Sequence, residues 1–92
     1  MPENDRRYTV RFDLHTQIQR LRYESRRRWT YAEIGERIGL HENTVQRMAA
    51  GATERIDFAV LEKLINFFRA EGLADFTVND LFVMEEVAQE AA

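Results

Sequence analysis

The stretch WTYAEIGERIGLHENTVQRMAAG, residues 29–51, decides the fold of this chain. Thr30 and Glu33 have the spacing of a capping box, in which the threonine hydroxyl accepts the amide proton of the glutamate while the carboxylate reaches back to the start of the helix. Ile34 and the isoleucine four residues later then lie on one face of the helix that the box opens. Gly39 can take the left-handed conformation that a tight turn needs, so the helix is predicted to stop there.

A second short helix is predicted directly after this turn. Its apolar pair is Val45 and Met48, almost every other side chain on it is polar, and Gly51 follows as a stop signal. Gly35 supplies the small residue that is needed where the first helix crosses the second. Two short helices joined by a glycine turn have the geometry of a helix-turn-helix unit, which we expect between Thr30 and Met48.

The second helix carries side chains that can reach the edges of bases in a DNA groove. They are the polar residues Glu42, Asn43, Gln46 and Arg47. Arginine can pair with guanine, asparagine and glutamine with adenine, and glutamate with the amino group of cytosine. We therefore interpret the helix from about Glu42 to Met48 as a recognition helix for the major groove of duplex DNA.

The residues before this unit predict a strand and a helix. Residues 8–12 alternate in a way that is typical of a short strand but also allows a loose arm. Asp13 can cap the helix that follows. We expect that helix to end in the arginine run 26–28, whose charges complement the negative end of the helix dipole. One face of the helix carries Leu14, Ile18, Leu21 and Ser25.

The residues after the unit predict a loop, a long helix and a short helical turn. Residues 52–55 are expected to form the loop, Asp57 can cap the long helix, and Gly72 ends it. The apolar stripe of the long helix is Leu61, Leu64, Ile65 and Phe68. The last helical turn is expected within residues 76–82, with Phe76, Val78, Leu81 and Phe82 buried.

The two ends of the chain are compatible with a small sheet. The acidic, alanine-rich tail from Glu85 is expected to fray. Residues 81–87 are nevertheless β-compatible, and we predict that they pair with residues 8–12, within one chain or across a dimer. We divide the chain into an N-terminal arm or short strand (1–12), a helix-turn-helix domain (13–83) and an acidic C-terminal tail (84–92).

Composition and charge limit the kind of protein. Ninety-two residues with 45% hydrophobic side chains suffice for one domain with one core, and the absence of cysteine excludes disulfides and thiolate metal ligands. Apolar runs are far shorter than a membrane span, and the polar start differs from a signal peptide, so we expect a cytoplasmic protein. The net charge of −3 hides a division, since residues 1–55 carry +3 and residues 56–92 carry −6.

The sequence contains no group of residues that is typical of a catalytic or metal-binding site. His15 and His41 are its only histidines, and neither has neighbours with the spacing of a metal site or of a catalytic triad. No glycine-rich phosphate loop is present either. We expect no metal, no cofactor and no enzymatic activity.

The run of residues 29–51 resembles the helix-turn-helix of the Cro/repressor-type (XRE-like) family of DNA-binding proteins. Further segments match in the right order, so the resemblance covers about Leu14 to Phe82. It implies an all-α fold of five helices, with a short two-stranded addition from the termini as an option. It also implies sequence-specific binding of double-stranded DNA, regulation of transcription and a homodimer on an inverted repeat. The further segments are residues 55–58, 61–64 and 77–82.

Position by position, the resemblance also implies which residues contact DNA. Base contacts fall on the four polar residues of the recognition helix, Glu42, Asn43, Gln46 and Arg47. Contacts to the DNA backbone fall on Tyr31, His41, Thr44, Thr53 and Arg55. To these we add Arg28 and Thr30, which precede the first helix of the unit.

Several residues allow two interpretations. Arg47 either reads a base or forms an ion pair with Glu42 or Glu36. The arginine run 26–28 is either a phosphate-binding patch or a charged helix end in solvent, and Trp29 is either a core anchor or a stacking platform. The phenylalanines that are either core or part of a dimer seam are Phe67, Phe68 and Phe82.

The whole protein also allows a second interpretation. A protein-interaction module, such as an antitoxin or adaptor, could keep this fold, and a regulator of a phage or mobile element could do both jobs. The acidic half from Ile56 onward favours a basic or protein partner. Glu42 would repel DNA phosphates. A selection experiment on random duplexes distinguishes these alternatives.

Overall fold

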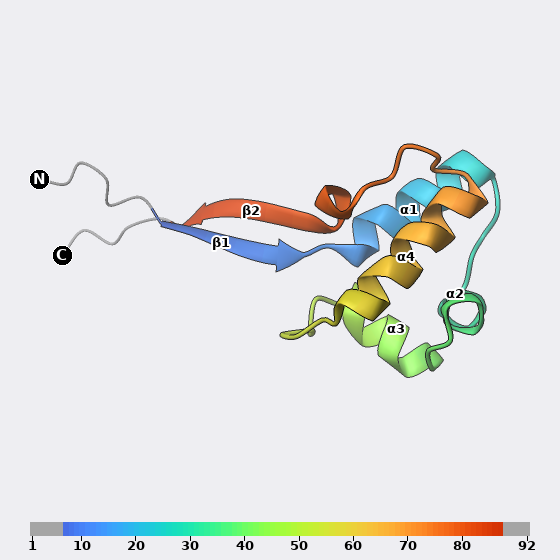
Figure 1. Cartoon of the computed structure of the whole chain (residues 1–92), viewed down its shortest axis with the longest axis horizontal. Helices are drawn as coiled ribbons and strands as arrows, with labels where there is room; N and C mark the ends of the chain where they lie inside the picture. Colours follow the sequence, from blue (N-terminus) through green and yellow to red (C-terminus); the bar gives the residue numbers. More distant parts are fainter. Residues whose placement is uncertain (1–6, 88–92) are drawn as a thin grey trace, which may run out of the picture.

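The computed structural model describes residues 7–87 and shows a helical body from which a two-stranded ribbon projects (Figure 1). Its elements are β1 (Arg7–Phe12), α1 (Leu14–Ser25), α2 (Tyr31–Ile38), α3 (Glu42–Ala49), α4 (Phe58–Glu71), the 3₁₀ turn η1 (Val78–Leu81) and β2 (Phe82–Val87). None of the helices in this part of the chain is long and apolar enough to cross a membrane.

One hydrophobic core lies between the helices. Trp29, in the connection from α1 to α2, is only 1% exposed and meets Phe67 of α4 edge-on, with ring centroids 5.0 Å apart. Phe68 stacks on Phe76 at 4.6 Å. Trp29 is therefore a core anchor, and Phe67 and Phe68 belong to the core. The predicted helix faces are buried too, namely Leu14, Ile18, Leu21, Ile34, Ile38, Val45, Met48, Leu61 and Leu64.

The predicted pairing of the two chain ends is confirmed, and it occurs within one chain. β1 and β2 are antiparallel, with Phe12 opposite Phe82 and Arg7 opposite Val87. The fraying predicted from Glu85 is wrong as far as Val87, because these residues belong to β2. Leu81 lies in η1 rather than in the strand. The parts of the predicted arm and tail in residues 1–6 and 88–92 lie outside the described residues.

The expectation of five helices is wrong, since the described residues form four α-helices and one 3₁₀ turn. Thr77 and Asp80 cap each other, with the Thr77 amide donating to Asp80 Oδ2 at 2.9 Å. Phe82 then takes an extended backbone that starts β2. So short a turn presents Leu81 to the core, while Val78, which was expected to be buried, is 40% exposed.

The end of α1 also differs from the prediction, because the helix stops before the arginine run. Arg26 has a left-handed backbone with φ of 54°, and Arg27 and Arg28 belong to the connection. This connection must bring the Trp29 side chain into the core, and Arg22 Nε fixes it by donating to the Trp29 carbonyl at 2.8 Å. Asp57 lies at the N-cap of α4 as predicted, but its side chain accepts no capping hydrogen bond.

Candidate nucleic-acid interface

The capping box predicted from the sequence fixes the start of α2. The Glu33 amide donates to Thr30 Oγ1 at 3.1 Å, and the Thr30 amide donates to Glu33 Oε1 at 3.0 Å. Accepting that backbone hydrogen bond, with further help from Arg27, lowers the pKa of Glu33. The Thr30 hydroxyl also lies 3.2 Å from Glu33 Oε1, so both protons of Thr30 are used inside the box.

The turn after α2 sets the angle at which α3 leaves. Gly39 has φ of 77°, and the Leu40 amide donates to the Gly35 carbonyl at 2.8 Å. This bond pulls the turn so close to α2 that a Cβ on Gly35 would lie 2.4 Å from the Leu40 carbonyl oxygen. The prediction that a small residue is required at this crossing is therefore explained by backbone packing.

His41 caps the N-terminus of α3 with its side chain. Its Nδ1 accepts a hydrogen bond from the Asn43 amide at 3.0 Å. Nδ1 must be unprotonated to accept, so in the neutral ring the proton is on Nε2. The exposed imidazole thus keeps one donor that can meet a phosphate oxygen.

The remainder of α3 has two unlike faces. Val45 and Met48 are buried and hold the helix against the core. The opposite face is solvent-exposed and carries Glu42, Asn43, Gln46 and Arg47. The four side chains predicted to reach base edges are therefore on one accessible surface.

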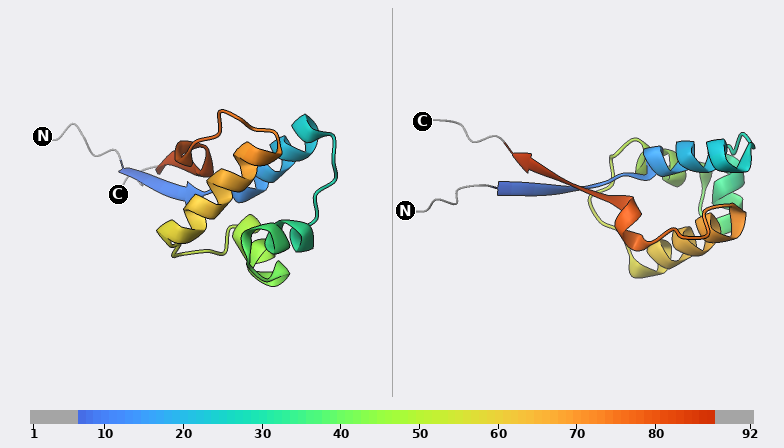
Figure 2. Two further views of the ribbon diagram at one scale, coloured as in Figure 1. Left: turned by 45° about the vertical axis from the view of Figure 1, so that its right-hand side comes forward. Right: turned by 90° about the horizontal axis from the view of Figure 1, so that it is seen from above.

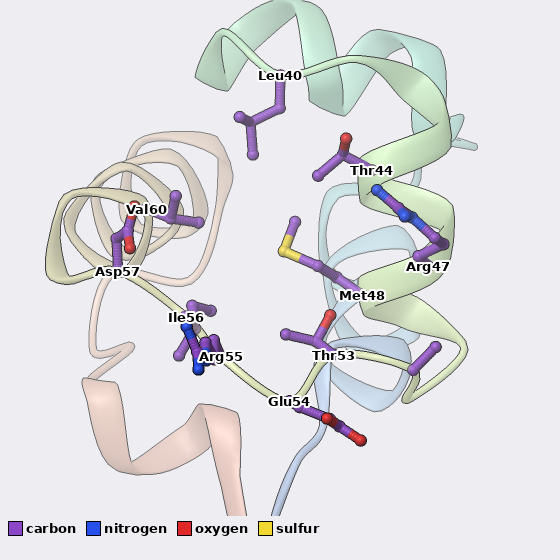
Figure 3. A pocket seen from close by; sticks show the side chains of 11 residues that line it. Leu40, Thr44, Arg47, Met48, Thr53, Glu54, Arg55, Ile56, Asp57 and Val60 are labelled. Carbon is purple, nitrogen blue, oxygen red and sulfur yellow. The ribbon is translucent and has the colours of Figure 1, made fainter.

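A hollow of about 290 Å³ lies beside α3, between this helix, the loop that follows it and the first turns of α4 (Figure 3). Met48 and Val60 contribute apolar side chains to it. The hollow also brings together four predicted contact residues that are up to eleven positions apart in the sequence, Thr44, Arg47, Thr53 and Arg55. Sequence reasoning assigned each of them separately but gave no sign of the shared hollow.

The arginines of the chain fall into two groups. Arg20 pairs with Asp75 at 3.3 Å and with Asp80 at 4.0 Å, and Arg37 pairs with Glu71. Arg26, Arg28, Arg47 and Arg55, in contrast, form no ion pair or side-chain hydrogen bond with another residue among 7–87. The ion pairs considered for Arg47, with Glu42 or Glu36, are not formed.

The three arginines of the run 26–28 make different contacts. Arg27 lies over the Trp29 ring, 3.6 Å from its centroid, and pairs with Glu33 at 3.3 Å. Arg26 and Arg28 are exposed. The three arginines therefore differ: Arg26 is the exposed C-cap of α1, and Arg28 is the exposed member next to α2. Tyr31, the first residue of α2, is half-buried against the core.

One part of this surface is acidic. Glu33, Glu36 and Glu42 line an open depression between α2 and the start of α3, together with His41. Carboxylates repel phosphates, so these three glutamates disfavour the DNA backbone, whereas His41 beside them can donate to a phosphate. Within residues 7–87 no group of three or more histidine, cysteine or acidic side chains is arranged to hold a metal ion.

The fold and this surface define the class of the protein, a helix-turn-helix protein whose unit is formed by α2 and α3. The chain matches the family model of the Cro/C1-type HTH DNA-binding domain over residues 18–83, and it belongs to this family. The family membership confirms the resemblance found in the sequence and makes DNA binding the function of the domain. No curated protein and no solved structure matches the chain.

Proposed function

We propose that the protein binds duplex DNA sequence-specifically as a transcriptional regulator, with α3 in the major groove. The observation that carries the proposal is the exposed polar face of α3, whose Arg47 has no ion pair or side-chain hydrogen bond with another residue among 7–87. Arginine can bond the O6 and N7 acceptors of guanine at once, and asparagine and glutamine can do the same for adenine. Base readout is therefore assigned to Glu42, Asn43, Gln46 and Arg47.

The residues around α3 are proposed to hold the DNA backbone. Arg28 and Arg55 are exposed cations on either side of the helix-turn-helix, and neither has a partner in the part of the chain that the structure describes. The Nε2 proton of His41 can serve as a further donor. Such contacts fix the register of the protein on the duplex but carry no sequence information. This set of backbone contacts also includes Tyr31, Thr44 and Thr53. We assign Thr30 instead to the positioning of α2, because its amide and hydroxyl protons are both hydrogen-bonded to Glu33.

We also propose that the protein binds as a homodimer on an inverted repeat. α3 has eight residues, so one copy reads few base pairs. Two copies on half-sites about one helical turn apart, roughly 34 Å, multiply the discrimination between sequences.

The alternative of a protein-interaction module depended on the acidic C-terminal half. Glu71, Asp75 and Asp80 of this half pair with Arg37 and Arg20 of the same chain. These three carboxylates therefore have intramolecular partners, which removes part of the support for this alternative; Glu42 and the net charge of −3 still favour it.

In vitro selection from random duplexes tests the proposal. The wild-type protein is expected to enrich one motif. Arg47→Ala is expected to cost about 1–3 kcal/mol on the best site and to relax preference at one base pair. Arg55→Ala, the matched control, is expected to weaken binding to all sequences alike, because it contacts phosphate. Failure to enrich any motif, or identical selection profiles for the two variants, would contradict the assignment.

A further inference from the structure

The ribbon formed by β1 and β2 has two unlike faces. Register partners of an antiparallel pair share one face of a sheet, as do alternate residues along each strand. One face of the ribbon therefore carries three residues of β1 and three of β2. Five of these six are apolar, and we call them the apolar face: Tyr8, Val10, Phe12, Phe82 and Met84. The sixth, Glu86, lies opposite Tyr8 at the outer end of the ribbon.

The apolar face continues the core of the body out into solvent. At the root of the ribbon the rings of Phe12 and Phe82 lie 5.6 Å apart and pack against the core. Further out, Tyr8 is 51% exposed, Val10 64% and Met84 66%. Figure 2 shows that the ribbon extends beyond the helices, so nothing in residues 7–87 covers this outer part.

The opposite face of the ribbon is more polar. It carries Arg7, Thr9, Arg11 and Glu85 together with Val83 and Val87. Arg11 lies 3.6 Å from Glu85 and 3.8 Å from Asp13. A two-stranded ribbon with no further packing is only marginally stable in water, so its exposed apolar side calls for a partner surface.

We propose that the apolar face packs against the same face of a second copy of this chain. The two-fold axis would cross the ribbon near Val10 and Met84, midway along the exposed apolar stretch. DNA is a poor occupant, because the apolar face has no basic residue and Arg11 points to the other side. An identical apolar stripe, in contrast, is complementary to itself under a two-fold rotation, since each residue of one copy meets an equivalent surface of the other.

The place of the ribbon on the body agrees with this dimer. Figures 1 and 2 show that it leaves the body on the side where α3 ends and α4 begins. A two-fold axis through the ribbon can therefore present both copies of α3 on one surface, as an inverted repeat requires; this step rests on the proposed function. Phe58, the first residue of α4, is 82% exposed and adds apolar surface on the same side.

The size of the apolar face predicts a weak dimer. Six residues of strand span about 20 Å, and two strands are roughly 10 Å wide. Two such faces bury less than the ~1,000 Å² that stable interfaces require. The free protein is therefore expected to dimerise with a dissociation constant on the order of 10 μM to 1 mM, and adjacent half-sites on DNA would raise the effective concentration of one copy near the other.

Sedimentation without DNA tests the interface. Val10→Lys places a charge on the apolar face, and Thr9→Lys places the same charge next to it on the opposite face. Wild type and Thr9→Lys are expected to self-associate with constants within about twofold of each other, and Val10→Lys at least tenfold more weakly. Thermal melting checks that both variants fold. A wild-type protein that stays monomeric up to about 1 mM, or two variants that weaken association equally, would overturn the proposal.

Disulfide trapping gives a second readout, because the chain contains no cysteine. Val10→Cys is expected to form a covalent dimer at least tenfold faster than Thr9→Cys under the same mild oxidation. Equal rates would exclude the apolar face as the interface. A different protein that binds this face would leave the purified chain monomeric in both assays and so overturn the second copy as occupant.

Binding to a single half-site separates this interface from the proposed function. Val10→Lys is expected to bind an isolated half-site as tightly as wild type, while losing cooperative binding to an inverted repeat. If the wild-type protein binds no DNA, the proposed function fails, but the sedimentation and trapping results still decide whether the apolar face dimerises.

Discussion

Gly35 lies where the turn after α2 folds back over its own helix. Alanine at this position would gain up to about 1 kcal/mol in helix propensity. Its Cβ, however, would meet the Leu40 carbonyl oxygen at 2.4 Å, and a backbone atom cannot move away without moving α3. Overpacking of this kind costs about 1–3 kcal/mol, so the clash outweighs the propensity.

We therefore expect Gly35→Ala to lower the free energy of unfolding by roughly 1 kcal/mol or more, measured by urea denaturation. Ala32→Gly, on the exposed side of the same helix, measures the propensity alone and is expected to cost about 1 kcal/mol. If Gly35→Ala were more stable than wild type, the close approach of the turn would be wrong.

Glu42 is the residue whose charge opposes DNA most directly. It is exposed in the first turn of α3, where the helix dipole favours an acid without any role for DNA. A carboxylate can also accept a hydrogen bond from cytosine, but it repels phosphates. The balance between these effects depends on the DNA sequence.

We expect Glu42→Gln to raise the affinity for random duplex DNA several-fold. We also expect it to reduce the ratio between the affinity for the best site and the affinity for random sequence. Binding of both duplexes at one salt concentration measures this. Glu62→Gln removes the same charge from the exposed side of α4 and is expected to leave this ratio unchanged. An equal rise on both duplexes would mean that Glu42 reads no base.

At the scale of the element, the helix boundaries that depend on neighbouring residues were predicted correctly from local sequence signals. The capping box of Thr30 and Glu33 and the left-handed Gly39 bound α2 as predicted. The prediction was wrong at the end of α1. The helical turn expected within residues 76–82 is present as η1, but the expected burial of Val78 was wrong. Distant packing decides at both places. Trp29 must enter the core directly after α1, and Phe82 must leave η1 in a strand that pairs with Phe12.

The capping box also makes the stability of α2 depend on pH. The pKa of Glu33 is lowered in the folded protein, so its carboxylate stabilises the fold above the pKa of the unfolded chain. This stabilisation is lost as the pH falls through the lower pKa of the folded state. Glu33→Gln removes the charge but keeps an oxygen that can accept the Thr30 amide.

We expect wild type to be more stable than Glu33→Gln at pH 7 and the difference in stability to disappear as the pH falls through the lowered pKa of Glu33. Urea denaturation at several pH values measures it. Glu36→Gln, also on α2 and outside the box, is the matched control for the same change of side chain. A difference between wild type and Glu33→Gln that stayed constant with pH would contradict the role of the charge.

At the scale of the whole molecule, three arginines without partners among residues 7–87 lie in or next to the helix-turn-helix, namely Arg28, Arg47 and Arg55. Acids of the C-terminal half pair with Arg20 and Arg37. Each phosphate contact releases counterions and contributes about −0.9 to the slope of log affinity against log salt. The net charge of −3 is therefore compatible with DNA binding, because it conceals this arrangement.

We expect Arg28→Ala to reduce the steepness of this slope by about 0.9, because it removes one phosphate contact. Arg20→Ala, which removes an arginine paired with Asp75 and Asp80, is expected to leave the slope unchanged. Titrations between low and physiological salt measure both. A wild-type affinity that does not vary with salt would argue against DNA as the partner.

The sequence by itself determined the helix-turn-helix, since its signals are local. A cap, an apolar pair and a glycine lie within a few residues of one another, and steric and hydrogen-bonding preferences act over that range. The polar face of α3 follows from the same periodicity. The sequence also predicted that the two ends of the chain can pair as strands. It did not decide whether they pair within one chain or across a dimer.

Only the tertiary structure decided which charged and apolar groups are left without partners. Contacts between residues far apart in the chain decide such questions. They determine whether Arg47 has an ion-pair partner, whether Arg20 pairs with Asp75, and whether Val10 is covered by the core or exposed. Such contacts form where the common core brings elements together, and no local pattern encodes them. The hollow beside α3 and the apolar face of the ribbon appear for this reason in the folded molecule alone.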